Sequence, residues 1–106
     1  MKVTVIITQN NPEQVFTALR FANYALNEGD SVSVFLTAEG VDLEKINDPR
    51  FDVSGQAVNF IGGGGTIEAC GTCLKLRESP GSEVCTPSTM KNMYAHVKEA
   101  DRVVTF

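Results

Sequence analysis

Two of the three cysteines stand close together in the segment Ala69-Cys70-Gly71-Thr72-Cys73-Leu74-Lys75-Leu76-Arg77. A C-x-x-C pair can form a disulfide, half of a metal site, a redox couple or a sulfur carrier. The thiolate is the reactive form of cysteine, and a nearby positive charge favours it. Because Arg77 follows on the same segment, we expect Cys70 and Cys73 to react and Arg77 to support an anionic sulfur.

Three other interpretations of the pair stay open. The thiols can be small buried side chains at a tight turn, since free cysteine is among the most often buried residue types. A zinc or iron–sulfur site would have four nominal ligands, namely Cys70, Cys73, Cys85 and His96, but its second half lacks close spacing. A thioredoxin-like redox couple would follow the first strand and begin a long helix, whereas this pair follows a third predicted strand.

The composition is that of one globular domain, which we place at residues 1–106. The chain has 42% hydrophobic and 21% charged residues, and its formal charge is −4 without a basic cluster. Nucleic acid is therefore not an expected partner. The apolar run at residues 3–7 is too short for a signal peptide or a membrane span, so we expect a cytoplasmic protein without a membrane partner. Thiols are mostly reduced there, and an odd cysteine count favours reactive or metal-binding thiols over a disulfide framework.

The first 37 residues predict a strand, a helix and a parallel second strand. Residues 2–8 are a nearly continuous β-branched run, typical of a strand buried on both faces, and we interpret it as the central strand. Asn11 and Pro12 are typical of a helix start, and Gly29 of a position just past a helix end. Residues 31–37 begin by alternating and predict the second strand, so the fold class is α/β with a mainly parallel sheet.

The predicted third strand, residues 66–70, places the cysteines at a strand end and a helix start. Before it, we expect a surface loop over residues 38–53 with a helical turn at 43–46, and a short helix capped by Ser54. Parallel sheets bind ligands at the carboxyl ends of their strands, and a helix begins near Gly71, where its dipole favours a thiolate. Glu68 opposes this effect. It shares a strand face with Cys70, and we expect that face to be open to solvent or covered by another subunit.

The remaining segments complete a sheet of about five strands. Val84-Cys85 is the remnant of a fourth strand or an extended loop. We expect Thr86-Pro87 to open a last helix, whose apolar stripe comprises Met90, Met93, Tyr94, Val97 and Ala100. Residues 102–106 predict a C-terminal strand.

The chain resembles the DsrE/DsrF/TusD superfamily of small sulfur-relay proteins in its opening strand and helix and in residues 35–41, 70–77, 88–90 and 100–106. The resemblance implies a flavodoxin-like fold, a single three-layer α/β/α domain, and assembly into a homotrimer or homohexamer. In the sulfurtransferase members, a cysteine after the third strand carries a persulfide and an arginine follows seven residues later. Cys70 and Arg77 have that spacing, while Cys73 and Glu78 depart from the pattern.

Our leading expectation is a sulfur-trafficking protein that carries sulfane sulfur as a persulfide. Cys70 would accept the sulfur and hand it to a partner protein, while Cys73 would either release it as sulfide or be the carrier itself. The expected partners are sulfur donor and acceptor proteins and copies of the chain, and we expect no cofactor and no metal. The alternative is a non-catalytic oligomeric module that binds a small ligand or a partner, with structural cysteines.

Overall fold

The computed structural model describes residues 1–106, which form one five-stranded sheet. Its strands are β1 (Lys2–Ile7), β2 (Ser31–Leu36), β3 (Thr66–Cys70), β4 (Thr86–Ser88) and β5 (Arg102–Thr105), in the order β4-β3-β2-β1-β5. All neighbouring strands are parallel. All five strands therefore end at the same edge of the sheet, and the α/β class predicted from the sequence is confirmed.

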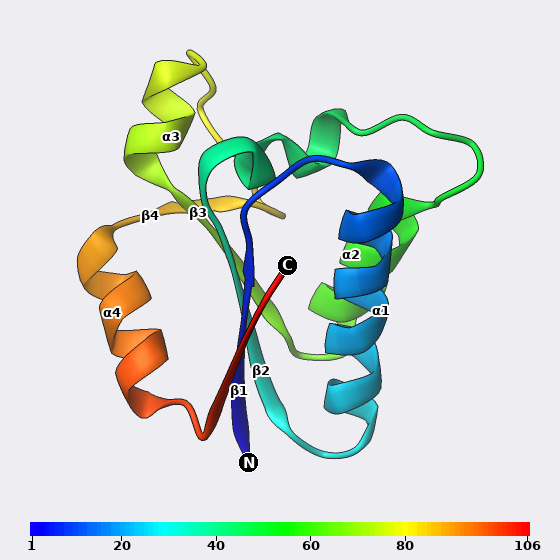
Figure 1. Ribbon diagram of the computed structural model, residues 1–106, viewed down its shortest axis with the longest axis vertical. Coiled ribbons are helices and arrows are strands. Elements are labelled where there is room, and N and C mark those ends of the chain that lie inside the picture. The colour runs from blue at the N-terminus through cyan, green and yellow to red at the C-terminus, as the bar shows by residue number, and fades with distance from the viewer.

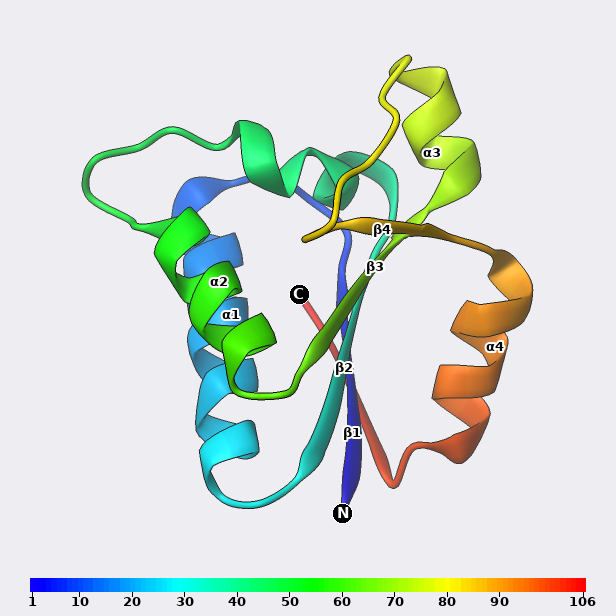
Figure 2. The same cartoon turned by 180° about the vertical axis from the view of Figure 1, so that it is seen from behind.

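Helices cover both faces of this sheet. Helices α1 (Pro12–Asn27) and α2 (Val53–Gly62) lie on one face, and α4 (Met90–Glu99) lies on the other (Figures 1 and 2). The short helix α3 (Gly71–Leu76) and the 3-10 helix η1 (Ala38–Lys45) lie at the carboxyl edge of the strands. The three-layer, flavodoxin-like α/β/α arrangement is thus confirmed, and none of the helices is long and apolar enough to cross a bilayer.

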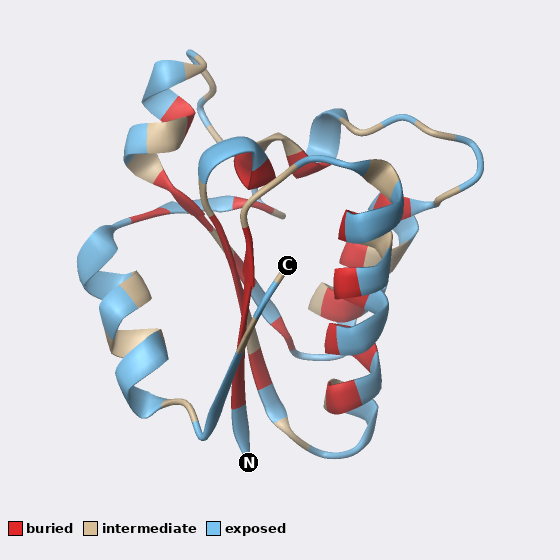
Figure 3. Ribbon diagram, in the orientation of Figure 1, coloured by how far each residue is buried: buried red, intermediate tan, exposed pale blue.

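The two helical layers pack against the sheet very differently. Helix α1 buries a stripe of small and branched side chains, namely Val15, Ala18, Leu19, Ala22 and Ala25. Helix α4 has no buried residue at all, and Figure 3 shows the contrast between the two layers. Since apolar burial is the main stabilising term, the hydrophobic core lies between the sheet and the α1–α2 layer.

The first strand–helix–strand unit agrees with the sequence in all but one respect. The Asn11 side chain accepts a hydrogen bond from the backbone N–H of Gln14 at 3.1 Å, and Gly29 follows the helix with φ at +93°. The prediction of β1 as the central strand is wrong, because β2 lies in the middle of the five. Strands β1 and β2 are both interior and apolar, so hydrophobicity alone does not distinguish the centre from its neighbour.

The segment after β2 is more ordered than the predicted surface loop. It begins with η1, which buries Val41 and Leu43 in the core, and only the part beyond it runs as a loop. Helix α2 is capped by Asp52 rather than by Ser54, because the Asp52 carboxylate accepts the Gly55 N–H at 3.0 Å. Aspartate and serine are equally good N-cap residues, so the sequence did not separate them.

The fourth strand lies two residues later than predicted. Residues 86–88 pair with β3, whereas Val84 and Cys85 precede the strand. Pro87 is tolerated because β4 is an edge strand, where one backbone face needs no N–H donor. The last helix consequently begins at Met90 instead of Thr86, with the Thr89 hydroxyl accepting the Asn92 N–H at 3.2 Å.

Candidate functional site

The carboxyl edge of the sheet brings both predicted cysteines into one pocket. Cys70 is the last residue of β3, and Cys73 lies in the first turn of α3. The pocket has a volume of about 490 Å³ and is lined by Thr37, Cys70, Gly71, Thr72, Cys73, Lys75, Ser88, Thr89 and Met90. The sequence-based placement of the pair at a strand end and helix start is therefore correct.

Cys73 is held by the chain that leaves β2. The backbone N–H of Ala38 donates a hydrogen bond to Cys73 Sγ at 3.2 Å, and Thr37 Oγ1 lies 3.9 Å from the same sulfur. Ala38 has φ at +51°, a left-handed conformation that residues other than glycine rarely adopt. This conformation directs a backbone donor at the sulfur, as an anionic thiolate requires.

The turn that presents Ala38 is fixed by a close approach of two backbones. A Cβ on Gly40 would lie 2.2 Å from the carbonyl oxygen of Ile7, at the end of β1. The Gly40 N–H also donates to the Thr37 carbonyl oxygen at 2.9 Å. The glycine thus lets η1 pass directly over β1 and holds the donor in place.

The surroundings of Cys73 favour its ionised form. Partial burial of the thiol opposes ionisation, but the Ala38 N–H, the Cys70 thiol, the Thr37 hydroxyl and the Arg77 charge together outweigh it. The pKa of Cys73 therefore lies below its ordinary value. None of the groups that shift this pKa is a carboxylate, so Glu68 does not oppose the ionisation of Cys73.

Arg77 lies at the carboxyl end of α3 and acts on Cys73 through its charge. Its Nε donates to Asp42 Oδ2 at 3.2 Å, and its Nη1 donates to the Cys73 carbonyl oxygen at 3.2 Å. These two bonds anchor the guanidinium between η1 and the turn that carries Cys73. Arg77 makes no hydrogen bond to the sulfur itself, and its contribution to the low pKa of Cys73 is electrostatic.

The other two thiols are buried. Cys70 is 5% exposed, and its thiol is one of the groups that lower the pKa of Cys73. Cys85 is 2% exposed, and burial together with the nearby Glu44 raises its pKa to about 12. Cys85 does not line the pocket, so the structure joins Cys70 to Cys73 and leaves the third cysteine out.

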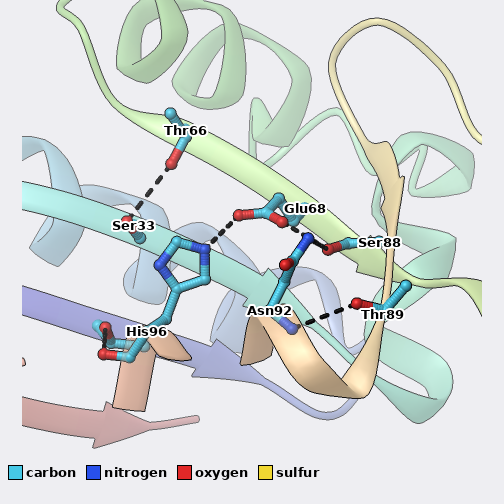
Figure 4. Close-up of polar contacts among 8 residues, drawn as sticks. Ser33, Thr66, Glu68, Ser88, Thr89, Asn92 and His96 are labelled. Atoms are coloured by element: carbon cyan, nitrogen blue, oxygen red, sulfur yellow. Dashed lines mark hydrogen bonds and ion pairs between the residues drawn. The ribbon is translucent and has the colours of Figure 1, made fainter. Parts of the chain in front are cut away.

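Glu68 belongs to a polar network beneath α4 (Figure 4). Its carboxylate accepts a hydrogen bond from Ser88 Oγ and contacts His96 Nε2, while Asn92 Nδ2 donates to Ser88 Oγ at 3.0 Å. Burial raises the pKa of Glu68, but its polar neighbours Ser88, His96 and Asn92 outweigh that effect and leave the pKa below its usual value. The expectation that this strand face is open or covered by another subunit is wrong, because α4 of the same chain covers it.

The four nominal metal ligands do not come together. No three His, Cys, Asp or Glu side chains are grouped so that they could hold a metal ion. His96 pairs with Glu68, and Cys85 is buried away from the pocket. The zinc or iron–sulfur alternative therefore has no support in the geometry.

Comparison with known proteins agrees with this architecture. Residues 1–106 match the DsrE/DsrF-like family over the whole chain. The chain belongs to the DsrE/DsrF-like family. Among DsrE/DsrF-like relatives, an uncharacterized protein of Methanocaldococcus jannaschii is 40% identical, with all of both chains covered. An uncharacterized protein of Methanopyrus kandleri is 36% identical, with 98% of this chain and 93% of that one covered.

Solved structures share the DsrE/DsrF-like fold. The YchN protein from E. coli has a TM-score of 0.85 with 100% of both chains covered and 19% sequence identity. A conserved protein of unknown function from Bacteroides thetaiotaomicron has a TM-score of 0.79 and 22% identity, covering 99% of this chain and 94% of that one. At these identities, the likeness supports the fold.

Sequence reasoning missed three residues that shape the DsrE/DsrF-like site. Thr37 and Ala38 contact the Cys73 sulfur, and Asp42 anchors Arg77. All three are far from the cysteines along the chain. The available signal was their position directly after β2, because the ends of neighbouring parallel strands meet at one edge.

Proposed function

We propose that this DsrE/DsrF-like protein relays sulfur by carrying sulfane sulfur as a persulfide on Cys73, with Cys70 beside it in the same pocket. Membership of the family suggests a sulfur-relay role. The single observation that supports the carrier residue is the hydrogen bond from the Ala38 N–H to Cys73 Sγ at 3.2 Å. The sequence favoured Cys70 by its spacing to Arg77, whereas the contacts favour Cys73.

The reaction needs an ionised and accessible sulfur. The Cys73 thiolate attacks the sulfane sulfur of a donor, the donor's sulfur–sulfur bond breaks, and the leaving group takes the electron pair. An acceptor thiolate then attacks the outer sulfur, and Cys73 leaves as a thiolate. The transfer exchanges one sulfur atom between thiolates, so neither an oxidant nor a reductant is consumed.

The same contacts stabilise both the thiolate and the persulfide. A persulfide is acidic and anionic, so the Ala38 N–H and the Arg77 charge favour it as they favour the thiolate. Cys70 is 5% exposed, so donor and acceptor molecules reach its sulfur less easily. We therefore assign Cys70 to supporting the Cys73 sulfur.

Intact-mass measurement after treatment with inorganic polysulfide tests the proposal. We expect an increase of about 32 Da, the mass of one sulfur, on the wild type and on Cys70→Ser. Cys73→Ser should not gain this mass, and Cys85→Ser should behave as the wild type. A wild type without the adduct would refute the sulfur-carrier function, and an adduct lost only in Cys70→Ser would move the carrier to Cys70.

A further inference from the structure

The pocket beside Cys73 is larger than a sulfur atom requires. Its volume of about 490 Å³ falls within the roughly 300–1,000 Å³ of typical small-molecule sites. Both cysteines stand in its wall, so a molecule bound there would have its own sulfur next to Cys73. The space indicates that the donor includes an organic group as well as the transferred atom.

Apart from the reactive Cys73 sulfur, the lining of the pocket carries one charge, and it is positive. Lys75 is the only charged residue among the nine that line it. The chain as a whole has thirteen acidic residues against nine basic ones, yet no carboxylate lines this wall. A carboxylate bound at the Lys75 side of the pocket is therefore attracted by the ammonium and meets no carboxylate in the lining.

The Lys75 ammonium is also free to bind a ligand. The neighbouring cation Arg77 is paired with Asp42, whereas Lys75 takes part in none of the five ion pairs of the chain. Among the hydroxyls of the wall, Ser88 and Thr89 already bond Glu68 and the Asn92 N–H. Thr72 has no such side-chain partner, and it shares α3 with Lys75 and Cys73.

We infer that the pocket takes a low-molecular-weight persulfide that bears a carboxylate, with its sulfane sulfur toward Cys73 and its carboxylate toward Lys75. This inference rests on the proposed sulfur-carrier function and names its donor class. The Cys73 thiolate bonds to the outer sulfur of the donor, and the bond between the two donor sulfurs breaks. The rest of the donor leaves as a thiolate with the electron pair of the broken bond. The transferred outer sulfur keeps its proton, so charge and oxidation level balance.

Three persulfides that share a two-carbon chain and end in groups of different charge test the inference. They are prepared from 3-mercaptopropionate, 2-mercaptoethanol and cysteamine, which are anionic, neutral and cationic, and loading of Cys73 is timed by mass. For each probe, the loading rate of the wild type is divided by that of Lys75→Gln. This ratio cancels the intrinsic reactivity of the probe. We expect Lys75→Gln to slow the anionic probe by about two- to fivefold, the effect of one exposed charge pair, and to leave the neutral probe unchanged.

Lys91→Gln is the matched control, because Lys91 is exposed on α4 and does not line the pocket. It should change none of the three rates. Equal effects of Lys75→Gln on all three probes would overturn the donor class and leave the sulfur-carrier function standing.

Alkylation separates the two claims further. Iodoacetate is anionic and iodoacetamide neutral, and the ratio of their rates at Cys73 is independent of the thiolate fraction. We expect Lys75→Gln to lower this ratio. A Lys75-dependent ratio with loading from polysulfide but from none of the three persulfides would overturn the donor class alone. The same ratio with no loading from polysulfide either would refute the sulfur-carrier function and the donor class with it, leaving an anion-attracting pocket.

Discussion

Cys73 and Cys85 carry the same thiol in opposite surroundings. Hydrogen-bond donors and a positive charge keep the pKa of Cys73 below its ordinary value, whereas burial and Glu44 raise that of Cys85 to about 12. Alkylation by iodoacetamide follows the thiolate fraction, so Cys73 should become reactive at a lower pH than an unfolded cysteine. Cys85 should stay protected throughout the neutral range. Peptide mapping of alkylation between pH 5 and 10 checks this, and equal rates at the two cysteines would contradict it.

Arg77 should act on Cys73 through charge alone. Replacing it by glutamine removes a positive charge that favours the thiolate, so the pH midpoint of Cys73 alkylation should rise. Arg77→Lys keeps the charge and should raise the midpoint less. Asp42→Asn is the control, because it removes the partner of Arg77 and leaves the cation. If the pH midpoint of Cys73 alkylation rises as much in Asp42→Asn as in Arg77→Gln, the anchored position of the guanidinium matters and not its charge alone.

At the scale of elements, the sulfur-binding turn depends on Gly40. A methyl group there would press on the Ile7 carbonyl, so Gly40→Ala should destabilise the protein by about 1–3 kcal/mol, as overpacking usually does. The same change should slow alkylation of Cys73, because it displaces the Ala38 N–H. Urea denaturation and alkylation rates measure the two effects.

Gly62→Ala provides the control for that substitution. Gly62 ends α2, and a Cβ there would meet nothing within 4 Å. Its replacement should be neutral or mildly stabilising, because alanine favours helix over glycine. If Gly62→Ala and Gly40→Ala lower the free energy of unfolding equally, the close approach of Gly40 to the Ile7 carbonyl does not determine the cost of the substitution.

The same scale shows what the sequence can predict. The sequence predicts the strands β1, β2 and β3 and the helix α1, because each segment has its own hydrophobic pattern or cap. The order of these elements along the chain also predicts that the strands are parallel. Edge strand β4 has three residues and one of them is Pro87, so it has no period to detect. The contacts of Ala38 with Cys73 and of Glu68 with His96 join residues distant in the chain, and only the packed strands bring them together.

At the scale of the whole molecule, α4 leaves apolar surface uncovered. Met90 and Tyr94 are 63% and 66% exposed on a helix that has no fully buried residue. Large exposed apolar side chains that gather on one face favour association. We propose that copies of the chain associate through α4 into the trimer or hexamer implied by the family resemblance.

Size-exclusion chromatography with light scattering tests this association. Tyr94→Lys should lower the assembly's mass, because it places a charge in the contact. Tyr24→Lys is the matched control, since Tyr24 is 68% exposed on α1, on the opposite face of the sheet. A monomeric wild type, or an equal loss of mass in both variants, would argue against α4 as the contact.

The central claim concerns where the sulfur is held, and peptide mapping addresses it directly. Wild-type protein is loaded with polysulfide, its persulfides are trapped with iodoacetamide, and the cysteine peptides are sequenced by mass spectrometry. The extra sulfur, of about 32 Da, should be found on Cys73, with Cys70 and Cys85 carrying none. Sulfur found on Cys70 alone, or spread evenly over all three cysteines, would contradict the assignment of Cys73 as the carrier.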